Sequence, residues 1–122
     1  MVEFEAIPRE LRELNQWLVW RYEQREGQAK PTKVPYNART GAKALSNKPK
    51  TWCDFNRAGM TARTLDYDGI GIAFRDGDGL AGVDLDHVID PETGEIDPKA
   101  AEILDWYAGT YCEVSPSGTG LR

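Results

Sequence analysis

Apolar residues recur at the spacing of one helical face in two stretches, which predicts helices at residues 8–15 and 98–111. Capping signals, with Trp52 and Phe55 as apolar anchors, predict another helix at residues 52–63. Thr51 is placed to cap this helix, with Asp54 in the capping-box position. Asp97 is placed to cap the helix at residues 98–111, and Pro98 suits its first turn because that turn needs no amide donor there.

Four shorter stretches concentrate β-branched and aromatic residues or alternate apolar with polar ones, which predicts strands at residues 17–23, 32–36, 69–74 and 80–88. A polar loop separates the first two strands, so we expect them to form a hairpin. The Asp- and Gly-rich turn at residues 75–79 predicts that the last two also form an antiparallel hairpin. A further strand-like run begins at Cys112 and leads into a Gly-rich loop at residues 115–120.

This order of elements predicts an α/β fold of the α+β kind, with helices packed on an antiparallel sheet. A chain of 122 residues fits a single domain. Within it we expect a helix, hairpin and helix subregion at residues 1–65, followed by a sheet and helix subregion at residues 66–122. The chain stops two residues after its Gly-rich loop, and such a loop normally joins two elements. We therefore expect a chain cut from a larger protein.

No stretch approaches the roughly 18–20 apolar residues that a membrane helix needs. The acidic start of the chain also lacks the basic and apolar regions of a secretory signal. We therefore expect a cytoplasmic protein with no membrane partner. Cys53 and Cys112 lie far apart and form no Cys-x-x-Cys pair, which predicts reduced cysteines rather than a zinc site.

The formal net charge of −5 conceals a segregation of charge along the chain. Charged residues between positions 27 and 53 are all basic, whereas those between 66 and 105 are acidic apart from Arg75 and Lys99. Basic residues beside aromatic ones can bind single-stranded nucleic acid through phosphate contacts and stacking. A hairpin that its lysines keep in solution explains the pattern equally well. The candidate nucleic-acid-binding residues, beside Trp52, are Lys30, Lys33, Tyr36, Lys43, Lys48 and Lys50.

Asp84 and Asp86 would share one face of the strand predicted at residues 80–88, because side chains alternate along a strand. Two like charges on one face repel, and a divalent cation between them relieves the repulsion. Carboxylate oxygens suit Mg²⁺ or Mn²⁺, the ions that serve nucleotidyl transfer. A solvated strand face is the alternative. His87 would point to the opposite face, as a structural histidine hydrogen-bonded at the strand end.

The Gly-rich loop offers hydroxyl groups and backbone amides, which are the groups that hold phosphate in many proteins. Clusters of Ser, Gly and Pro more often mark a turn, so the loop alone does not decide the function. Its candidate phosphate-binding residues are Ser115, Ser117, Gly118 and Thr119.

Three groups of motifs occur in a characteristic order: residues 16–20 with 33–37, Gly41 and 51–52; residues 71–74 leading into 83–88; and the loop at residues 113–121. Together they resemble the N-terminal part of primase-polymerases of the archaeo-eukaryotic primase superfamily, in the form found in phages and other mobile elements. Each motif is short, but they span nearly the whole chain in the expected order.

The resemblance implies an RRM-like antiparallel sheet with packed helices, preceded by an N-terminal helix and hairpin. It implies an enzyme that joins nucleoside triphosphates on a DNA template, with Asp84 and Asp86 binding the catalytic Mg²⁺ or Mn²⁺. Arg122 stands where the family usually has a histidine that contacts the phosphates of the nucleotide. Arginine can hold phosphate, but it cannot exchange a proton at neutral pH.

The third motif of the family, a further carboxylate, has no counterpart in the chain. We therefore expect a primase-polymerase fragment that is inactive alone, in the cytoplasm of a bacterium or a phage-infected host, with a helicase domain or protein as a candidate partner. The alternative is a short phage protein that uses the same fold as a binding or inhibitory module against a host nucleic-acid machine. A reading frame that continues past Arg122 into a further Asp would favour the enzyme.

Overall fold

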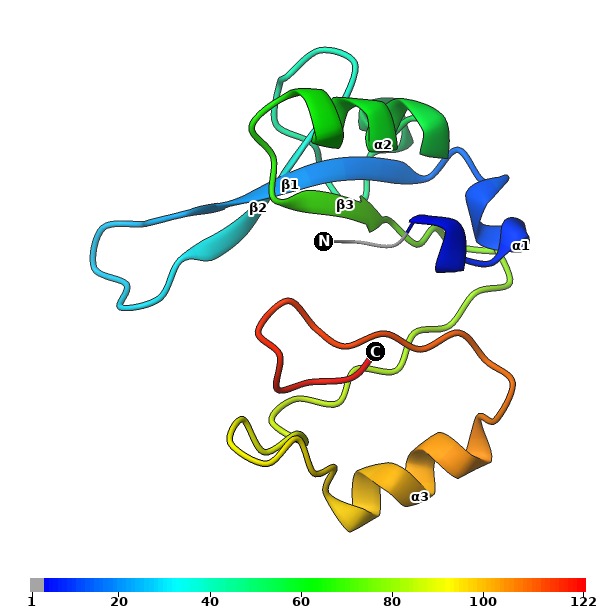
Figure 1. The fold of residues 1–122 in the computed structure, drawn as a ribbon. Helices are drawn as coiled ribbons and strands as arrows, with labels where there is room; N and C mark the ends of the chain where they lie inside the picture. Colours follow the sequence, from blue (N-terminus) through cyan, green and yellow to red (C-terminus); the bar gives the residue numbers. More distant parts are fainter. Residues whose placement is uncertain (1–3) are drawn as a thin grey trace. The chain divides into compact units, whose positions relative to one another are not determined.

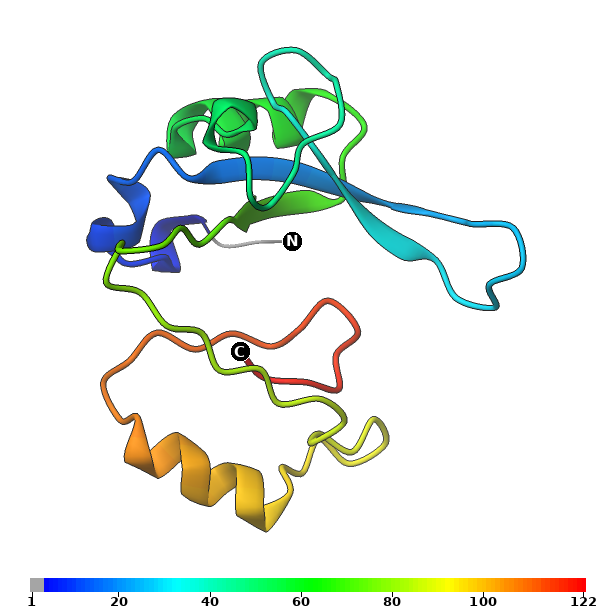
Figure 2. The same ribbon diagram turned by 180° about the vertical axis from the view of Figure 1, so that it is seen from behind.

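The computed structural model describes residues 4–122 and shows an α+β fold (Figures 1 and 2). The chain divides into two compact units, one that ends at Leu80 and one that runs from Ala81 to Arg122. The sequence predicted two subregions that meet after residue 65, whereas the two units meet after Leu80. The strand at residues 69–72 pairs with a strand of the first unit and so belongs to that unit. The single domain stays a prediction. Over residues 4–122, no helix has the length and apolar content needed to cross a bilayer.

Strand β1 (Trp17–Glu23) is the centre of a three-stranded antiparallel sheet with the order β2-β1-β3. β2 (Thr32–Tyr36) pairs with one edge of β1, which confirms the first predicted hairpin. β3 (Gly69–Ile72) pairs with the other edge. Val19 has both strands beside it and has no exposed surface, at 0%. The core of the first unit is therefore built on the middle of β1.

Helix α2 (Phe55–Thr64) covers one face of this sheet (Figure 1). Asp54 caps the helix by accepting a hydrogen bond from an amide of its first turn at 2.7 Å. The ring of its first residue packs edge-on against Trp17, with ring centroids 5.0 Å apart. The hydroxyl of Thr61 donates to the carbonyl of Ala38 at 3.1 Å. The helix thereby holds both the sheet and the loop that follows β2.

Glycines in β3 make room for the indole ring of Trp20. A Cβ atom at Gly69 would lie 3.0 Å from that ring, and one at Gly71 would lie 3.3 Å from the side chain of Leu18. The indole N–H of Trp20 also donates to the carbonyl of Ile70 at 3.1 Å. The Gly-Ile-Gly-Ile pattern of β3 therefore fits the edge of β1, because β3 has no side chains where the indole ring of Trp20 lies.

Two of the predicted helices are shorter than expected. The helix predicted at residues 8–15 is α1 (Arg9–Arg12), because the chain straightens to enter β1. The helix predicted at residues 98–111 is α3 (Pro98–Trp106), because the residues after it form turns. Asp97 caps α3 as predicted, accepting a hydrogen bond from an amide of its first turn at 2.9 Å.

The prediction that Thr51 caps the second helix is wrong. Trp52 is buried, and Cys53 exchanges backbone hydrogen bonds of 2.9 and 2.8 Å with Trp17 at the start of β1. This pairing requires extended backbone, so the helix begins only after it. The hydroxyl of Thr51 instead donates to the carbonyl of Lys48 at 2.7 Å.

The hairpin predicted from residues 69–74 and 80–88 is also wrong. β3 ends at Ile72 and pairs with β1, while residues 80–88 form no strand and only Leu85 makes an isolated bridge. The partner of a strand depends on side-chain fit across the sheet, and the glycines of β3 fit β1.

The segment after β3 is held by Asp78. Its carboxylate accepts hydrogen bonds from the amides of Arg75 and Leu80, each at 2.8 Å. It also accepts from the side-chain nitrogen of Gln16 at 3.1 Å, and the same nitrogen donates to the carbonyl of Ala73 at 2.8 Å. Gln16 immediately precedes β1, so Asp78 ties the last turn of the first unit to the start of its central strand.

Asp78 predicts a dependence of stability on pH. The amides of Arg75 and Leu80 lower the pKa of Asp78 below its ordinary value. A carboxyl whose pKa is lower in the folded state stabilises the fold above its unfolded pKa, and this contribution is lost as pH falls through the folded pKa. We expect Asp78→Asn to lower the thermal unfolding midpoint at neutral pH, with a deficit that shrinks as the pH falls below about 4.

Asp76→Asn is the matched control, because Asp76 lies in the same loop and its carboxylate has no hydrogen bond within residues 4–122. Unfolding followed by circular dichroism from about pH 7 to pH 3 makes the comparison. A deficit in Asp78→Asn that stays constant over this range would contradict the assignment.

Candidate active site

The second unit is organised by backbone pairing around Leu121. Leu121 and Leu85 exchange hydrogen bonds of 2.8 and 2.9 Å, and Leu121 forms a second antiparallel bridge with Val114. The last residues of the chain therefore lie between the segment of Leu85 and the segment of Val114, as Figures 1 and 2 show. Leu121 is buried, at 6% exposure.

Asp84 and Asp86 flank Leu85 in this arrangement, and both are exposed. The strand predicted at residues 80–88 is absent, so the alternation expected along its whole length does not apply. The pairing at Leu85 preserves this alternation locally. The side chains on either side of a paired residue share one face, opposite to the face of that residue's own side chain. Antiparallel register then places Asp84 opposite Arg122 and Asp86 opposite Gly120.

Gly120 occupies a position that accepts no side chain. A Cβ atom there would lie 2.9 Å from the carbonyl oxygen of Leu85 and 3.0 Å from the hydroxyl of Ser115. Gly120 is buried, and its amide donates to that hydroxyl at 3.0 Å. The glycine therefore allows the two neighbouring segments to approach, and it leaves the position opposite Asp86 without a side chain.

The hydroxyl groups of the Gly-rich loop bond to one another. Ser117 lies 2.8 Å from Ser115 and 3.1 Å from Thr119, oxygen to oxygen. The amide of Gly118, which has a φ of +81°, donates to the carbonyl of Ser115 at 2.9 Å, and the amide of Thr119 lies 3.4 Å from the hydroxyl of Ser117. A phosphate bound to this loop would have to replace some of these bonds.

Arg122 forms an ion pair that the sequence did not reveal. Its Nε lies 2.9 Å from Oε1 of Glu113, and the Tyr111 hydroxyl donates to Oε2 of the same carboxylate at 2.8 Å. Burial, and next the bond to Glu113, raise the pKa of Tyr111 to about 12. The sequence did offer one signal: the oppositely charged Glu113 and Arg122 lie just before and just after the Gly-rich loop.

His87 has a backbone role in place of the expected side-chain role. Its φ of 55° is left-handed, a conformation that His adopts more readily than most residues. Unbroken pairing would bring the amide of His87 to the carbonyl of Thr119, but the amides of Val88 and Ile89 bond there instead, at 2.8 and 2.9 Å. His87 is therefore an extra residue that bulges from the pairing. Its exposed imidazole has no hydrogen bond in the part of the chain that the structure describes.

The two aspartates fit a magnesium-type site only as partial ligands. No group of three His, Cys, Asp or Glu side chains within residues 4–122 could hold a metal ion. Mg²⁺ is commonly bound by one or two carboxylates, with water and substrate phosphates completing its coordination. Asp84 and Asp86 are exposed hard-oxygen donors, so they fit that kind of site.

The candidate nucleic-acid residues lie in the first unit, and they divide by exposure. Tyr36 is buried, its hydroxyl donates to Glu23, and the guanidinium of Arg21 lies 4.5 Å from its ring centroid. Trp52 is buried as well, so neither ring is available for stacking on bases. The lysines, which are all exposed, are Lys30, Lys33, Lys43, Lys48 and Lys50.

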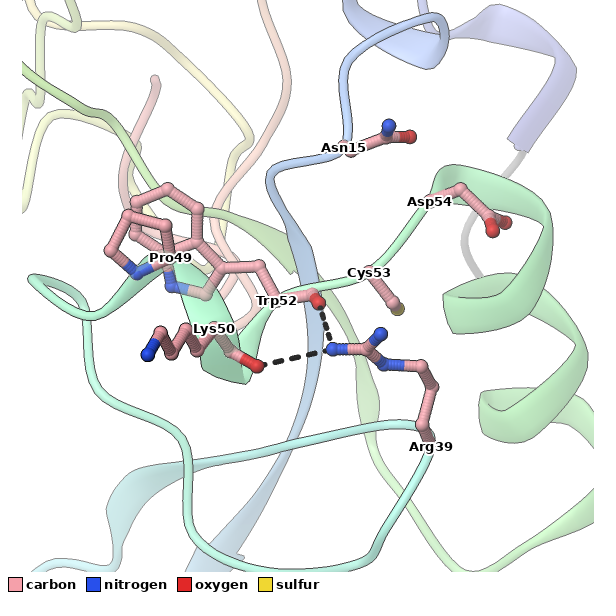
Figure 3. Close-up of a pocket in the computed structure, with 7 residues that line it drawn as sticks. All are labelled: Asn15, Arg39, Pro49, Lys50, Trp52, Cys53 and Asp54. Atoms are coloured by element: carbon pink, nitrogen blue, oxygen red, sulfur yellow. Dashed lines mark hydrogen bonds between the residues drawn. The ribbon is translucent and has the colours of Figure 1, made fainter.

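A pocket of about 470 Å³ lies beside the start of α2 in the first unit (Figure 3). One guanidinium nitrogen of Arg39 donates to the carbonyls of Lys50 and Trp52, at 3.1 and 2.9 Å. Asp54 and Lys50 also line the pocket. Because both signs of charge are present, the lining does not select an anion or a cation.

A DNA primase-polymerase of Nitratiruptor phage NrS-1 is 35% identical to this chain over 107 residues. The matched part is 88% of this chain and 14% of the phage protein. This chain is related to a phage primase-polymerase. The resemblance inferred from the motifs is therefore confirmed, over a stretch that is a small part of the relative's length. No protein-family model matches the chain.

The packing of Gly120 predicts that Gly120→Ala disrupts the pairing of the second unit. The new Cβ would overlap backbone and hydroxyl atoms, which costs about 1–3 kcal/mol in packed sites. We expect a lower thermal midpoint and faster amide hydrogen exchange at Leu85 and Leu121. Gly59→Ala is the control, because a Cβ there meets Phe4 only at 3.5 Å, an ordinary contact. Unchanged exchange at Leu85 in Gly120→Ala would contradict the packing.

Proposed function

We propose that this chain contributes part of the catalytic centre of a primase-polymerase, an enzyme that joins nucleoside triphosphates on a DNA template. The observation that carries the proposal is the pairing around Leu121. It brings the segment of Asp84 and Asp86 beside Arg122 and the Gly-rich loop, in a chain related to a phage primase-polymerase. Nucleotidyl transfer uses metal-binding carboxylates together with cations that stabilise the phosphates, and this pairing offers candidates for both.

Asp84 and Asp86 are the residues proposed to hold Mg²⁺ or Mn²⁺. When bound, such an ion supplies charge stabilisation for the transferring phosphoryl group and lowers the pKa of the attacking hydroxyl. The exposure of both carboxylates supports this role, since the remaining ligands would come from solvent and substrate. The pairing of Leu85 fixes the backbone between them, so that little ordering of the main chain is needed on binding.

Arg122 is proposed to bind the phosphates of the nucleotide, with Ser115, Ser117, Gly118 and Thr119 beside it in the loop. Guanidinium groups bind phosphate through two parallel hydrogen bonds, which orient as well as attract it. The hydroxyls are already arranged in a chain, so a phosphate oxygen could exchange with one of their mutual bonds. The template is proposed to contact the exposed lysines of the first unit, of which Lys43 and Lys48 are examples.

The metal assignment predicts that Asp84→Asn and Asp86→Asn each weaken Mn²⁺ binding by about tenfold or more, because each removes a charged oxygen ligand. Electron paramagnetic resonance of free Mn²⁺ titrated with the protein measures the dissociation constant. Asp105→Asn is the matched control, since it removes an exposed carboxylate of α3 in the same unit. Equal affinities in all three variants would refute the assignment.

A second expectation concerns activity. The chain carries two carboxylates of the proposed metal site, and the described residues add no third beside them. We expect the purified 122-residue chain to bind Mn²⁺ and a nucleoside triphosphate without extending a primer. Gel analysis of a labelled primer on a DNA template tests this, and primer extension abolished by Asp84→Ala would contradict it.

A further inference from the structure

Glu113 and Arg122 are joined by backbone and side chain together. Their main chains exchange hydrogen bonds of 2.6 and 2.9 Å, and their side chains form the ion pair at 2.9 Å. An exposed ion pair between flexible side chains usually contributes little to stability. Here the backbone pairing already brings the two residues side by side, so less ordering is needed to form the contact.

Tyr111 fixes the orientation of the Glu113 carboxylate. Its hydroxyl donates to Oε2 at 2.8 Å, while Oε1 accepts from Arg122, so each oxygen has one partner. The hydroxyl of Tyr111 is protonated at neutral pH, far below its pKa of about 12, and is therefore a donor. The carboxylate is thus held from both sides, and its position determines where the Nε–H of Arg122 points.

The contact with Glu113 uses only part of the guanidinium. A guanidinium has five N–H donors, and the bond from Nε leaves four on its two terminal nitrogens. Within residues 4–122 those nitrogens make no other side-chain hydrogen bond or ion pair. The arginine side chain is 38% exposed, and register places Arg122 opposite Asp84. The free edge of the group is therefore accessible to a ligand bound near the aspartates.

We infer that Glu113 is a positioning residue: held by Tyr111, it orients the guanidinium of Arg122 toward the phosphates of a nucleoside triphosphate bound at Asp84 and Asp86. This inference rests on the proposed function and deepens it. Glu113 itself does not touch the nucleotide. Its negative charge opposes phosphate binding, while its hydrogen bond favours binding by ordering the arginine in advance.

These two opposing effects are separable by substitution. Glu113→Gln removes the charge but keeps an oxygen that accepts from Nε–H and an amide that can donate to the hydroxyl of Tyr111. Glu113→Ala removes the charge and the contact together. If positioning dominates, the two variants differ; if charge dominates, they behave alike.

The test is a set of titrations of the 122-residue chain with a non-hydrolysable deoxynucleoside triphosphate and Mn²⁺, by isothermal calorimetry. We expect Glu113→Ala to weaken triphosphate binding by about fivefold, the loss caused by one side chain that must be ordered on binding. Glu113→Gln should stay within about twofold of the unaltered chain. Mn²⁺ binding without nucleotide should be the same in all variants.

A double-mutant cycle with Arg122→Ala separates positioning from a structural role. Glu113→Ala should cause no further loss of affinity when Arg122 is already alanine. A loss that persists in that background, or equal losses in Glu113→Ala and Glu113→Gln, would overturn the inference. Thermal unfolding checks each variant, and Tyr111→Phe carries the same cycle if Glu113→Ala fails to fold.

The failure of this inference can be distinguished from the failure of the proposed function. If the unaltered chain binds no triphosphate in the presence of Mn²⁺, the proposed function fails and the positioning role fails with it. If the unaltered chain binds triphosphate and Glu113→Ala binds it equally well, only the positioning role is overturned.

Discussion

Leu121 forms backbone pairs on both sides, with Leu85 and with Val114. The placement of the candidate site depends on this double pairing, because residues 80–88 form no regular strand of their own. It fixes which residues lie opposite one another, so that Arg122 and Gly120 face the two aspartates. It also explains the glycine: only a residue without a side chain lets Leu85 and Ser115 approach the same position. Main-chain pairing therefore positions the charged side chains of Asp84, Asp86 and Arg122 along the chain segments.

The first unit also depends on close contacts of the main chain. Its sheet is completed by a strand whose glycines admit the indole of Trp20, and its last turn is held by Asp78. Aromatic rings that composition suggested for nucleic-acid stacking are used instead to build the core, as Tyr36 shows. Exposed lysines remain on its surface. The rings of Tyr36 and Trp52 therefore belong to the core, while the candidate lysines lie on the surface.

Local signals in the sequence were sufficient for some of this structure. The first hairpin follows from two β-rich runs around a polar loop, and the cap of α3 follows from Asp97 before a proline. The partner of β3 was not predictable in this way, because alternation tells which face of a strand is apolar but not which strand lies beside it. The strand proposed to hold Asp84 and Asp86 does not form, so a common side for the two carboxylates follows only from the pairing at Leu85. The pair between Glu113 and Arg122 required the register of a turn, which single residues do not reveal.

The bulge at His87 affects how many residues can share the face that carries Asp84 and Asp86. One extra residue enters the Leu85 segment directly after Asp86, so the alternation of sides is reset beyond it. Position 88 therefore does not continue the row begun by Asp84 and Asp86, and a carboxylate introduced there would not enlarge it. On this side of Leu85, the local alternation that includes the two carboxylates therefore ends at Asp86. Under the proposed metal role, further ligands would come from another segment, from water or from the nucleotide itself.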